Sequence, residues 1–213
     1  MNSILIMVPT YETISTETFE SIWTMHNQEN VSIYFKSVKG YDCARARNEC
    51  VKYFLSTDKT HLMMIDSDIV LPVDILEKDL RYLDSLINYE ATKDIVLGWY
   101  PRKNEPTKTE IFMTGYDGYP AAARWNCSEL RRWPKKIIQV NGGGFGCAIV
   151  PRYVLEAIEF PYFKYDLRDD GTYISEDLYF CNKAREAGFK INTITTLGCD
   201  HIKRDIVKAN PYR

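Results

Sequence analysis

The stretch Leu62-Met63-Met64-Ile65-Asp66-Ser67-Asp68 is an apolar segment that ends abruptly in two carboxylates separated by one residue. Its apolar part is short and bounded by polar residues, which predicts a buried β-strand. In an open parallel sheet, ligands bind beside the carboxyl ends of the strands. Carboxylate oxygens at such an edge suit Mg²⁺ or Mn²⁺, which could neutralise a diphosphate. The structural alternative is a polar turn before Pro72, and the stretch alone favours neither interpretation.

Similar short apolar segments alternate with amphipathic stretches through the first half of the chain. This alternation predicts strands at residues 4–8, 31–35, 61–65 and 95–99. Helices are expected after polar residues or proline that can start them, at residues 16–28, 43–55 and 73–89. Alternation of this kind is typical of an α/β domain, with a mostly parallel central sheet flanked by helices.

After residue 99, glycine, proline and aromatic residues interrupt this pattern, and no linker or repeat separates the two halves. Loops and hairpins are expected here, with strands at residues 111–114, 137–140 and 191–196 and helices at residues 151–158 and 176–187. We therefore expect a single domain over residues 1–213 whose C-terminal half is rich in loops.

The composition excludes several classes of protein. The chain has 213 residues, with 27 Lys and Arg against 29 Asp and Glu and no basic block, so bulk attraction to nucleic acid or an anionic membrane is not supported. No apolar stretch approaches the roughly 20 residues that span a bilayer, so no transmembrane segment is expected.

The N-terminus lacks the pattern of a secretory signal, which predicts a reducing, cytoplasmic compartment. The cysteines are scattered without a C-x-x-C pair, which argues against a zinc ribbon or a redox dithiol.

Three further features could carry chemistry. Glu176-Asp177 opens a predicted helix, where acids either serve a reaction or only complement the helix dipole. His201 follows an apolar strand and could complete a metal site, although a lone histidine is more often structural. The run Gly142-Gly143-Gly144-Phe145-Gly146 lets the backbone approach a ligand closely, or forms a loop without a role. This run fits neither a dinucleotide fingerprint nor a P-loop.

Six features occur in a specific order along the chain: VPTY at residues 8–11, ARARN at 44–48, DSD at 66–68, GGGFG at 142–146, SEDLYFC at 175–181, and His201. This series resembles the GT-A nucleotide-sugar glycosyltransferases, in particular the large family-2-like group. The resemblance covers residues 4–203, and residues 176–189 are its most telling part. Within the group, the chain is similar to the N-terminal glycosyltransferase domain of a multidomain chlorella-virus protein. That similarity implies one domain of a longer chain, located in the host cytoplasm.

The resemblance implies a Rossmann-like GT-A fold with a nucleotide-sugar-binding first half and an acceptor-binding second half, divided near residue 100. Pro9, Thr10 and Tyr11 match the loop that family members place beside the nucleotide base. Asp42 and Arg45 match positions that face the base and ribose or the diphosphate. The implied donor is a UDP-sugar, because uracil is the commonest donor base in the family.

The same resemblance implies a divalent cation, Mn²⁺ or Mg²⁺, as cofactor. Asp68 matches the D-x-D acid that ligates the cation, and His201 matches a late histidine that joins the metal site in some members. Asp66 matches the acid nearer the ribose and the donor sugar, and Ser67 is assigned to the same donor site.

Transfer to a hydroxyl of a glycan acceptor is the implied reaction. Asp177 matches the acid that acts as general base toward that hydroxyl in inverting members. Gly143, Gly144 and Phe145 match the loop along the donor sugar and the acceptor pocket. Inversion follows if a carboxylate acts as base without a covalent sugar intermediate. Retention would require a different arrangement, which the residues leave open.

Other functions also remain open at this level. Asp66-Ser67-Asp68-Ile69-Val70 fits the D-x-D-x-[TV] motif of haloacid-dehalogenase-type phosphatases, although two strand–helix units precede it and no later G-D-x-x-x-D motif follows. A sugar nucleotidyltransferase would share the metal chemistry, but its glycine-rich N-terminal phosphate loop is absent. A glycan- or nucleotide-binding module without activity would keep the fold and the aromatic residues and would need no base.

Overall fold

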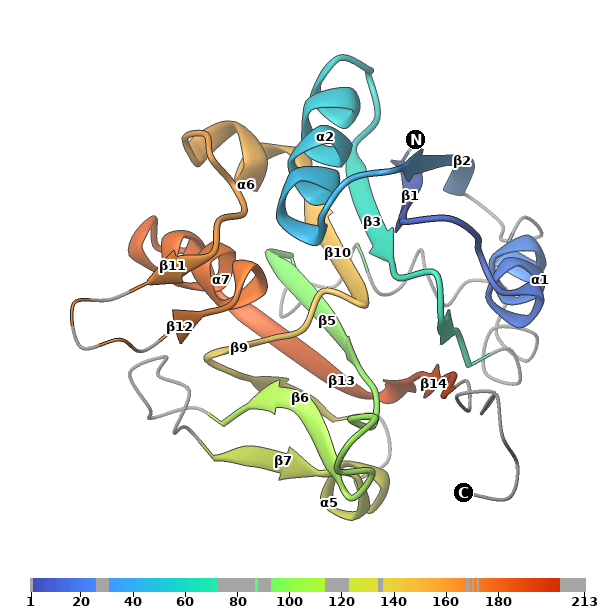
Figure 1. The fold of residues 1–213 in the computed structure, drawn as a ribbon, viewed down its shortest axis with the longest axis vertical. Helices are drawn as coiled ribbons and strands as arrows, with labels where there is room; N and C mark the ends of the chain where they lie inside the picture. The colour runs from blue at the N-terminus through green and yellow to red at the C-terminus, as the bar shows by residue number, and fades with distance from the viewer. Residues whose placement is uncertain are drawn as a thin grey trace, which may run out of the picture.

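A seven-stranded central sheet organises the protein (Figure 1). The computed structural model describes residues 2–25, 31–72, 87, 93–113, 123–133, 136–167, 169, 171 and 173–203. The strands of the central sheet are β1 (Asn2–Thr10), β2 (Val31–Lys39), β3 (His61–Ile65), β5 (Ile95–Trp99), β8 (Ile137–Gln139), β10 (Cys147–Pro151) and β13 (Ile191–Gly198). Their order across the sheet is β2-β1-β3-β10-β5-β13-β8.

The directions of the strands bring several chain segments to one edge of this sheet. β1 pairs in parallel with β2 and β3, and β13 pairs in parallel with β5. β10 runs antiparallel to both of its neighbours, β3 and β5, and β8 runs antiparallel to β13. The strands β2, β1, β3, β5 and β13 therefore share one direction, and the sheet is mixed but mostly parallel. Their carboxyl ends meet at the edge where β10 begins, since Ile65 pairs with Cys147.

Alternation of side chains along the strands builds a core on each face of the sheet. Leu5 and Met7 of β1 pack on one face with residues of α2 (Cys43–Leu55), α6 (Arg152–Ala157) and α7 (Glu176–Glu186). Ile4 and Ile6 of β1 pack on the other face with residues of α1 (Thr16–Thr24). This period of two is what a strand buried on both sides requires. Figure 1 shows α1 lying apart from α2, α6 and α7.

Smaller elements complete the fold. They are the three-stranded sheet of β7 (Arg124–Asn126), β6 (Lys108–Phe112) and β9 (Gly142–Gly143), the pair β11 (Asp166–Leu167) and β12 (Tyr173–Ile174), the pair β4 (Ile69–Val70) and β14 (Asp200–His201), and the short helix α5 (Cys127–Arg131). Among the helices that the structure describes, none is long and apolar enough to cross a membrane.

Most expected elements of the first half occur at or near their predicted bounds. The helix at 43–55 and the strands at 61–65 and 95–99 are confirmed without a change of bounds, and the first strand is longer than expected. The expected helix at 73–89 lies outside the described residues, apart from residue 87. No sequence pattern predicts β10, which directly follows the glycine-rich run. β10 is buried along its whole length, as is β5, but the glycine-rich run before it is typical of a loop in sequence.

The glycine-rich run is required by close packing against Tyr100. A Cβ atom on Gly144 would clash with the Tyr100 hydroxyl, and one on Gly146 would lie 2.7 Å from Cζ of the same ring. The Gly146 N–H also donates to the Tyr100 hydroxyl at 3.0 Å. The absence of side chains at these positions therefore lets the backbone lie against the tyrosine ring.

An aromatic cluster joins the start of β10 to α7. The rings of Phe145, Phe163 and Phe180 lie with centroids 4.9–5.1 Å apart, and all three are buried.

We expect Phe180→Ala to lower the free energy of unfolding by about 3–5 kcal/mol, because it leaves a cavity in this cluster. Urea denaturation measures this change. Phe19→Ala, on the exposed face of α1, is the matched control. Its free energy of unfolding should fall by less than about 1 kcal/mol. Equal losses in the two variants would contradict a structural role for the cluster.

Candidate functional site

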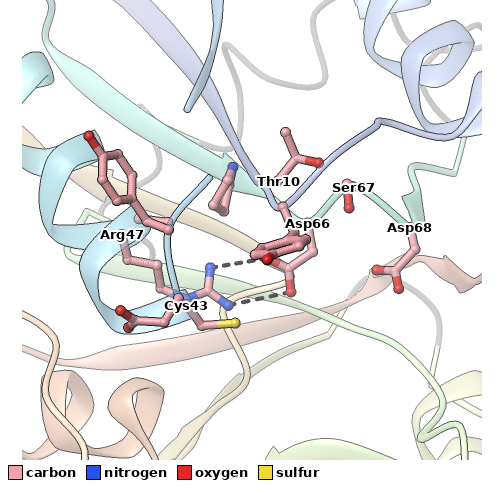
Figure 2. A pocket seen from close by; sticks show the side chains of 11 residues that line it. Thr10, Cys43, Arg47, Asp66, Ser67 and Asp68 are labelled. Atoms are coloured by element: carbon pink, nitrogen blue, oxygen red, sulfur yellow. Dashed lines mark hydrogen bonds and ion pairs between the residues drawn. The ribbon is translucent and has the colours of Figure 1, made fainter. Parts of the chain in front are cut away.

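Two adjoining cavities open at the edge where the carboxyl ends of the strands meet. The first, called here the α2 cavity, measures about 330 Å³. It is lined by Pro9, Thr10, Tyr11, Tyr41, Asp42, Cys43, Ala46, Arg47, Asp66, Ser67 and Asp68. Figure 2 shows Asp66 facing Arg47, whereas Asp68 lies farther along the same loop.

The second cavity, called here the β6 cavity, measures about 310 Å³. It is lined by Asp66, Tyr100, Glu110, Phe112, Arg124, Gly143, Gly144, Ser175, Asp177, Leu178 and His201. Asp66 lines both cavities and so marks the boundary between them. A ligand that extends from one cavity to the other would pass this carboxylate.

The start of α2 places a cation between the two cavities. Asp42 is the N-cap residue of α2, and its carboxylate accepts from the Arg45 N–H at 3.1 Å. Arg47 lies on the buried face of the helix, in the series Ala44, Arg47, Val51 and Phe54 at helical spacing. Only 3% of Arg47 is exposed, so its charge needs partners inside the protein.

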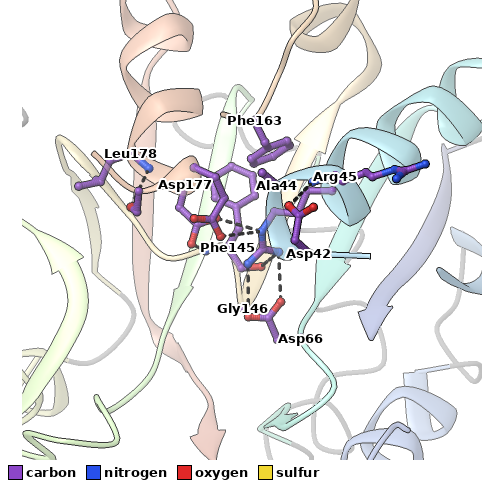
Figure 3. A network of polar contacts seen from close by, with 12 residues as sticks. Asp42, Ala44, Arg45, Asp66, Phe145, Gly146, Phe163, Asp177 and Leu178 are labelled. Atoms are coloured by element: carbon purple, nitrogen blue, oxygen red, sulfur yellow. Dashed lines mark hydrogen bonds and ion pairs between the residues drawn. The ribbon is translucent and has the colours of Figure 1, made fainter. Parts of the chain in front are cut away.

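Three carboxylates surround Arg47, and Figure 3 shows two of them, Asp66 and Asp177, in one network of polar contacts. Its Nη1 lies 3.1 Å from Asp66 Oδ1, and its Nε lies 3.0 Å from Asp177 Oδ1 and 3.8 Å from Glu176 Oε1. Nη1 also donates to the Phe145 carbonyl oxygen at 3.4 Å. Burial lowers the pKa of the guanidinium, but the carboxylates raise it more, so Arg47 stays charged. The arginine thus holds Asp66 and Asp177 on either side of one fixed positive charge.

Asp177 is a buried carboxylate that can exchange a proton near neutral pH. Burial, with a smaller contribution from Glu176, raises the pKa of Asp177 to about 7, although the charge of Arg47 opposes the shift. Oδ2 accepts from the Phe145 N–H at 3.1 Å, while Oδ1 forms no hydrogen bond with any described residue. Ser175 is the N-cap residue of α7, so Asp177 is not needed to cap the helix. A carboxylate of this kind is suited to act as a general base.

Asp68 and His201 lie together where β4 pairs with β14. Asp68 Oδ1 is 3.8 Å from His201 Nε2, and the Ile202 N–H donates to the Asp68 carbonyl oxygen. His201 Nδ1 lies 2.9 Å from the Pro101 carbonyl oxygen, which can only accept, so Nδ1 carries the proton. In the neutral imidazole, Nε2 then carries the lone pair on the side of Asp68, as a metal ligand must.

These two side chains fit a divalent cation that is completed by ligands from a substrate. A carboxylate and an imidazole suit Mn²⁺, and a carboxylate suits Mg²⁺. No group of three or more His, Cys, Asp and Glu side chains that could hold a metal occurs among the described residues. Phosphate oxygens and water would therefore have to supply the remaining ligands, as is usual for Mg²⁺ at phosphate sites. A lysine also contacts this site, since Lys103 Nζ pairs with Asp68 Oδ2.

The structure brings most of the predicted site residues to these cavities. Pro9, Thr10, Tyr11, Asp42, Asp66, Ser67 and Asp68 line the α2 cavity, and Gly143, Gly144, Asp177 and His201 line the β6 cavity. Arg45 is not among the lining residues, and its guanidinium lies 4.3 Å from the centre of the Tyr41 ring. Phe145 reaches the site only through its backbone, because its ring is buried in the aromatic cluster.

Sequence reasoning missed two cations of this site. Arg47 belongs to the quoted string ARARN, and the helical spacing of its buried neighbours is a signal that could have separated it from Arg45. Lys103 lies in an irregular segment with no periodic pattern, so no signal in the sequence pointed to it.

Comparisons with known proteins address the fold. No protein-family model matches the chain, and no curated protein matches it. Among solved structures, A197 from STIV aligns with a TM-score of 0.62 at 18% identity over 96% of this chain and 87% of that one. GalNAc-T7, whose structure contains UDP, GalNAc and Mn²⁺, aligns with a TM-score of 0.61 at 9% identity over 99% of this chain.

GalNAc-T7 is a GT-A glycosyltransferase, and the alignment includes the whole mixed sheet with its flanking helices. The chain has the GT-A fold. This confirms the fold class expected from the sequence. The identities are so low that the likeness concerns the fold alone, and this chain spans 45% of the GalNAc-T7 chain.

The charge balance around Arg47 sets the proton affinity of Asp177. We expect Arg47→Gln to move the pKa of Asp177 above 7, since it removes the charge that lowers this pKa. Loss of the partner of buried carboxylates should also lower the free energy of unfolding by about 3–5 kcal/mol. Carboxyl ¹³C NMR measures the titration of Asp177, and urea denaturation measures the free energy of unfolding. Arg47→Lys keeps a positive charge and should give a smaller pKa change, and an unaltered pKa in Arg47→Gln would contradict the assignment.

Proposed function

We propose that the chain is a metal-dependent glycosyltransferase that moves a sugar from a nucleoside diphosphate sugar to a hydroxyl of a glycan acceptor. The observation that carries the proposal is the position of Asp177. This carboxylate has a pKa of about 7 and lines the β6 cavity together with His201, and Asp66 separates it from the α2 cavity, which Asp68 lines. A group that can accept a proton thus faces a site suited to a diphosphate, in a GT-A fold.

The α2 cavity is the proposed donor site. Pro9, Thr10 and Tyr11 form the part assigned to the nucleotide base, where the exposed ring of Tyr11 is available for stacking. Asp42 at the start of α2 is assigned to the base and ribose. Ser67 lies between the two acids that would flank the donor. The structure of GalNAc-T7 with UDP supports a UDP-sugar as the first donor to test.

Asp68 and His201 are the proposed ligands of Mn²⁺ or Mg²⁺. When bound there, the cation would compensate the negative charge of the leaving diphosphate. The Nδ1–H tautomer of His201, set by the Pro101 carbonyl oxygen, keeps Nε2 free for this role. The Mn²⁺ in the GalNAc-T7 structure supports the choice of metal.

Asp177 is the proposed general base. Its ionised carboxylate accepts the proton of the acceptor hydroxyl while the hydroxyl oxygen bonds to the anomeric carbon of the donor sugar. The bond from that carbon to the diphosphate oxygen breaks, and the diphosphate leaves with the electron pair. Attack from the side opposite the leaving group inverts the anomeric carbon. Arg47 holds Asp177 in place, and Asp66 at the boundary of the cavities is assigned to the donor sugar.

We extend the proposal to the organisation of the chain. Residues 1–100 are assigned to the donor, and all residues that line the α2 cavity belong to this half. Residues 101–213 are assigned to the acceptor, and they supply most of the residues that line the β6 cavity. A cytoplasmic location and membership of a longer viral protein also remain proposals, which the sequence resemblance supports.

Nucleotide binding should depend on the metal. In calorimetric titrations of UDP, GDP and dTDP, we expect one nucleotide, UDP first, to bind in the presence of Mn²⁺ and to lose affinity in EDTA. Asp68→Asn should weaken this binding at least about tenfold, because it removes a proposed metal ligand. Asp58→Asn, at an exposed position after α2, is the matched control and should bind like the wild type. Failure of all three nucleotides to bind in any condition would contradict the donor site.

Turnover should depend on the ionised form of Asp177. The carboxylate accepts a proton only when ionised, so kcat/KM should fall about tenfold per pH unit below pH 7, where its pKa lies. Asp177→Asn should keep nucleotide binding and lose turnover by about 10²–10⁴-fold. Glu186→Gln, at the far end of α7, is the control and should leave turnover unchanged. An active Asp177→Asn enzyme with the same pH profile would contradict the role of Asp177.

A further inference from the structure

Lys103 occupies the position of a cation beside Asp68. Its Nζ pairs with Asp68 Oδ2, while His201 Nε2 lies 3.8 Å from the other carboxylate oxygen. Lys103 belongs to the segment between β5 and β6, two residues after Pro101, whose carbonyl oxygen accepts from His201 Nδ1. The lysine and the histidine are therefore held at the same carboxylate by one short stretch of chain.

A lysine in this position competes with a divalent cation. Asp68 is the only carboxylate in the proposed metal pair, and the ammonium contacts one of its two oxygens. Two cations in contact with one carboxylate repel each other, because like charges a few ångströms apart raise the energy of the site. The ammonium on Oδ2 thus disfavours a metal on Oδ1 and His201 Nε2, and the metal binds more tightly once Lys103 has left Asp68.

We propose that Lys103 holds Asp68 in the metal-free protein and is exchanged for the divalent cation when the nucleoside diphosphate binds. The proposal rests on the proposed function and adds a positioning residue to it. Lys103 and Asp68 are each about one third exposed, so the ammonium can leave without unfolding its surroundings. The diphosphate offers the displaced ammonium new oxygen partners close to its starting position.

The exchange makes metal and nucleotide bind cooperatively. Without nucleotide, Mn²⁺ must break the ion pair of Lys103 and Asp68, and the ammonium gains no partner in return. With nucleotide, the phosphate oxygens take over the ammonium, so the same metal binds more tightly. By linkage, Mn²⁺ strengthens nucleotide binding by the same factor. Lys103 therefore reduces loading of the site with metal alone.

Calorimetric titration of Mn²⁺ into the wild type and Lys103→Gln, each with and without UDP, tests the exchange. We expect Lys103→Gln to bind Mn²⁺ alone about three- to tenfold more tightly than the wild type, a modest factor because the ion pair is partly exposed to water. Addition of UDP should strengthen Mn²⁺ binding less in this variant than in the wild type. Lys52→Gln, at an exposed position in the last turn of α2, is the matched control and should behave like the wild type.

The other outcomes separate this inference from the proposed function. Equal Mn²⁺ affinity of the wild type and Lys103→Gln would overturn the exchange and leave the donor site intact, provided that Asp68→Asn abolishes the binding. Binding of UDP without metal that is lost in Lys103→Gln would also overturn it, because Lys103 would then be the permanent cation of the site. Absence of Mn²⁺ binding from every protein, with and without UDP, would overturn both the exchange and the proposed metal site.

Discussion

The buried positive charge of Arg47 is the interaction on which the site depends. A charged guanidinium that is 3% exposed is stable only when carboxylates surround it, and here they come from two different segments, the loop after β3 and the start of α7. The same contact joins α2 to both segments and reaches the backbone before β10. The arginine also determines the chemistry of Asp177. Burial alone would raise the pKa of this carboxyl further, and the charge of Arg47 holds it near 7.

The strand directions explain why these segments meet. Five strands of the central sheet run in one direction, so the residues after β1, β3, β5 and β13 gather at one edge. The antiparallel β10 begins at this edge and brings the glycine-rich run between Asp66 and Asp177. The pairing of β4 with β14 then sets His201 beside Asp68. Two adjoining cavities result, one lined by Asp68 and one containing the buried carboxylate of Asp177.

Much of this arrangement follows from the sequence. The strand before Asp66 is a short apolar run, and the rule that ligands bind at carboxyl ends of parallel strands was enough to place Asp66 and Asp68 in a cleft. The order of the motifs supported the GT-A fold, which the structural comparison confirms. The roles assigned to these residues stay predictions.

The features of the site that the sequence did not predict have identifiable physical causes. β10 directly follows the glycine-rich run, whose Gly144 and Gly146 pack against Tyr100, and a glycine-rich run is typical of a loop in sequence. Arg45 and Arg47 differ only in the side of α2 that they occupy, which becomes clear from the buried positions of the helix. Lys103 meets Asp68 across 35 positions of sequence, through a tertiary contact that no local pattern encodes.

A crystal structure of the protein with UDP and Mn²⁺ would locate both ligands. We expect the nucleotide in the α2 cavity, the metal bound by Asp68 and His201, and the β6 cavity open beside Asp177, which stays paired with Arg47. A nucleotide bound elsewhere, or a metal held away from Asp68 and His201, would contradict it.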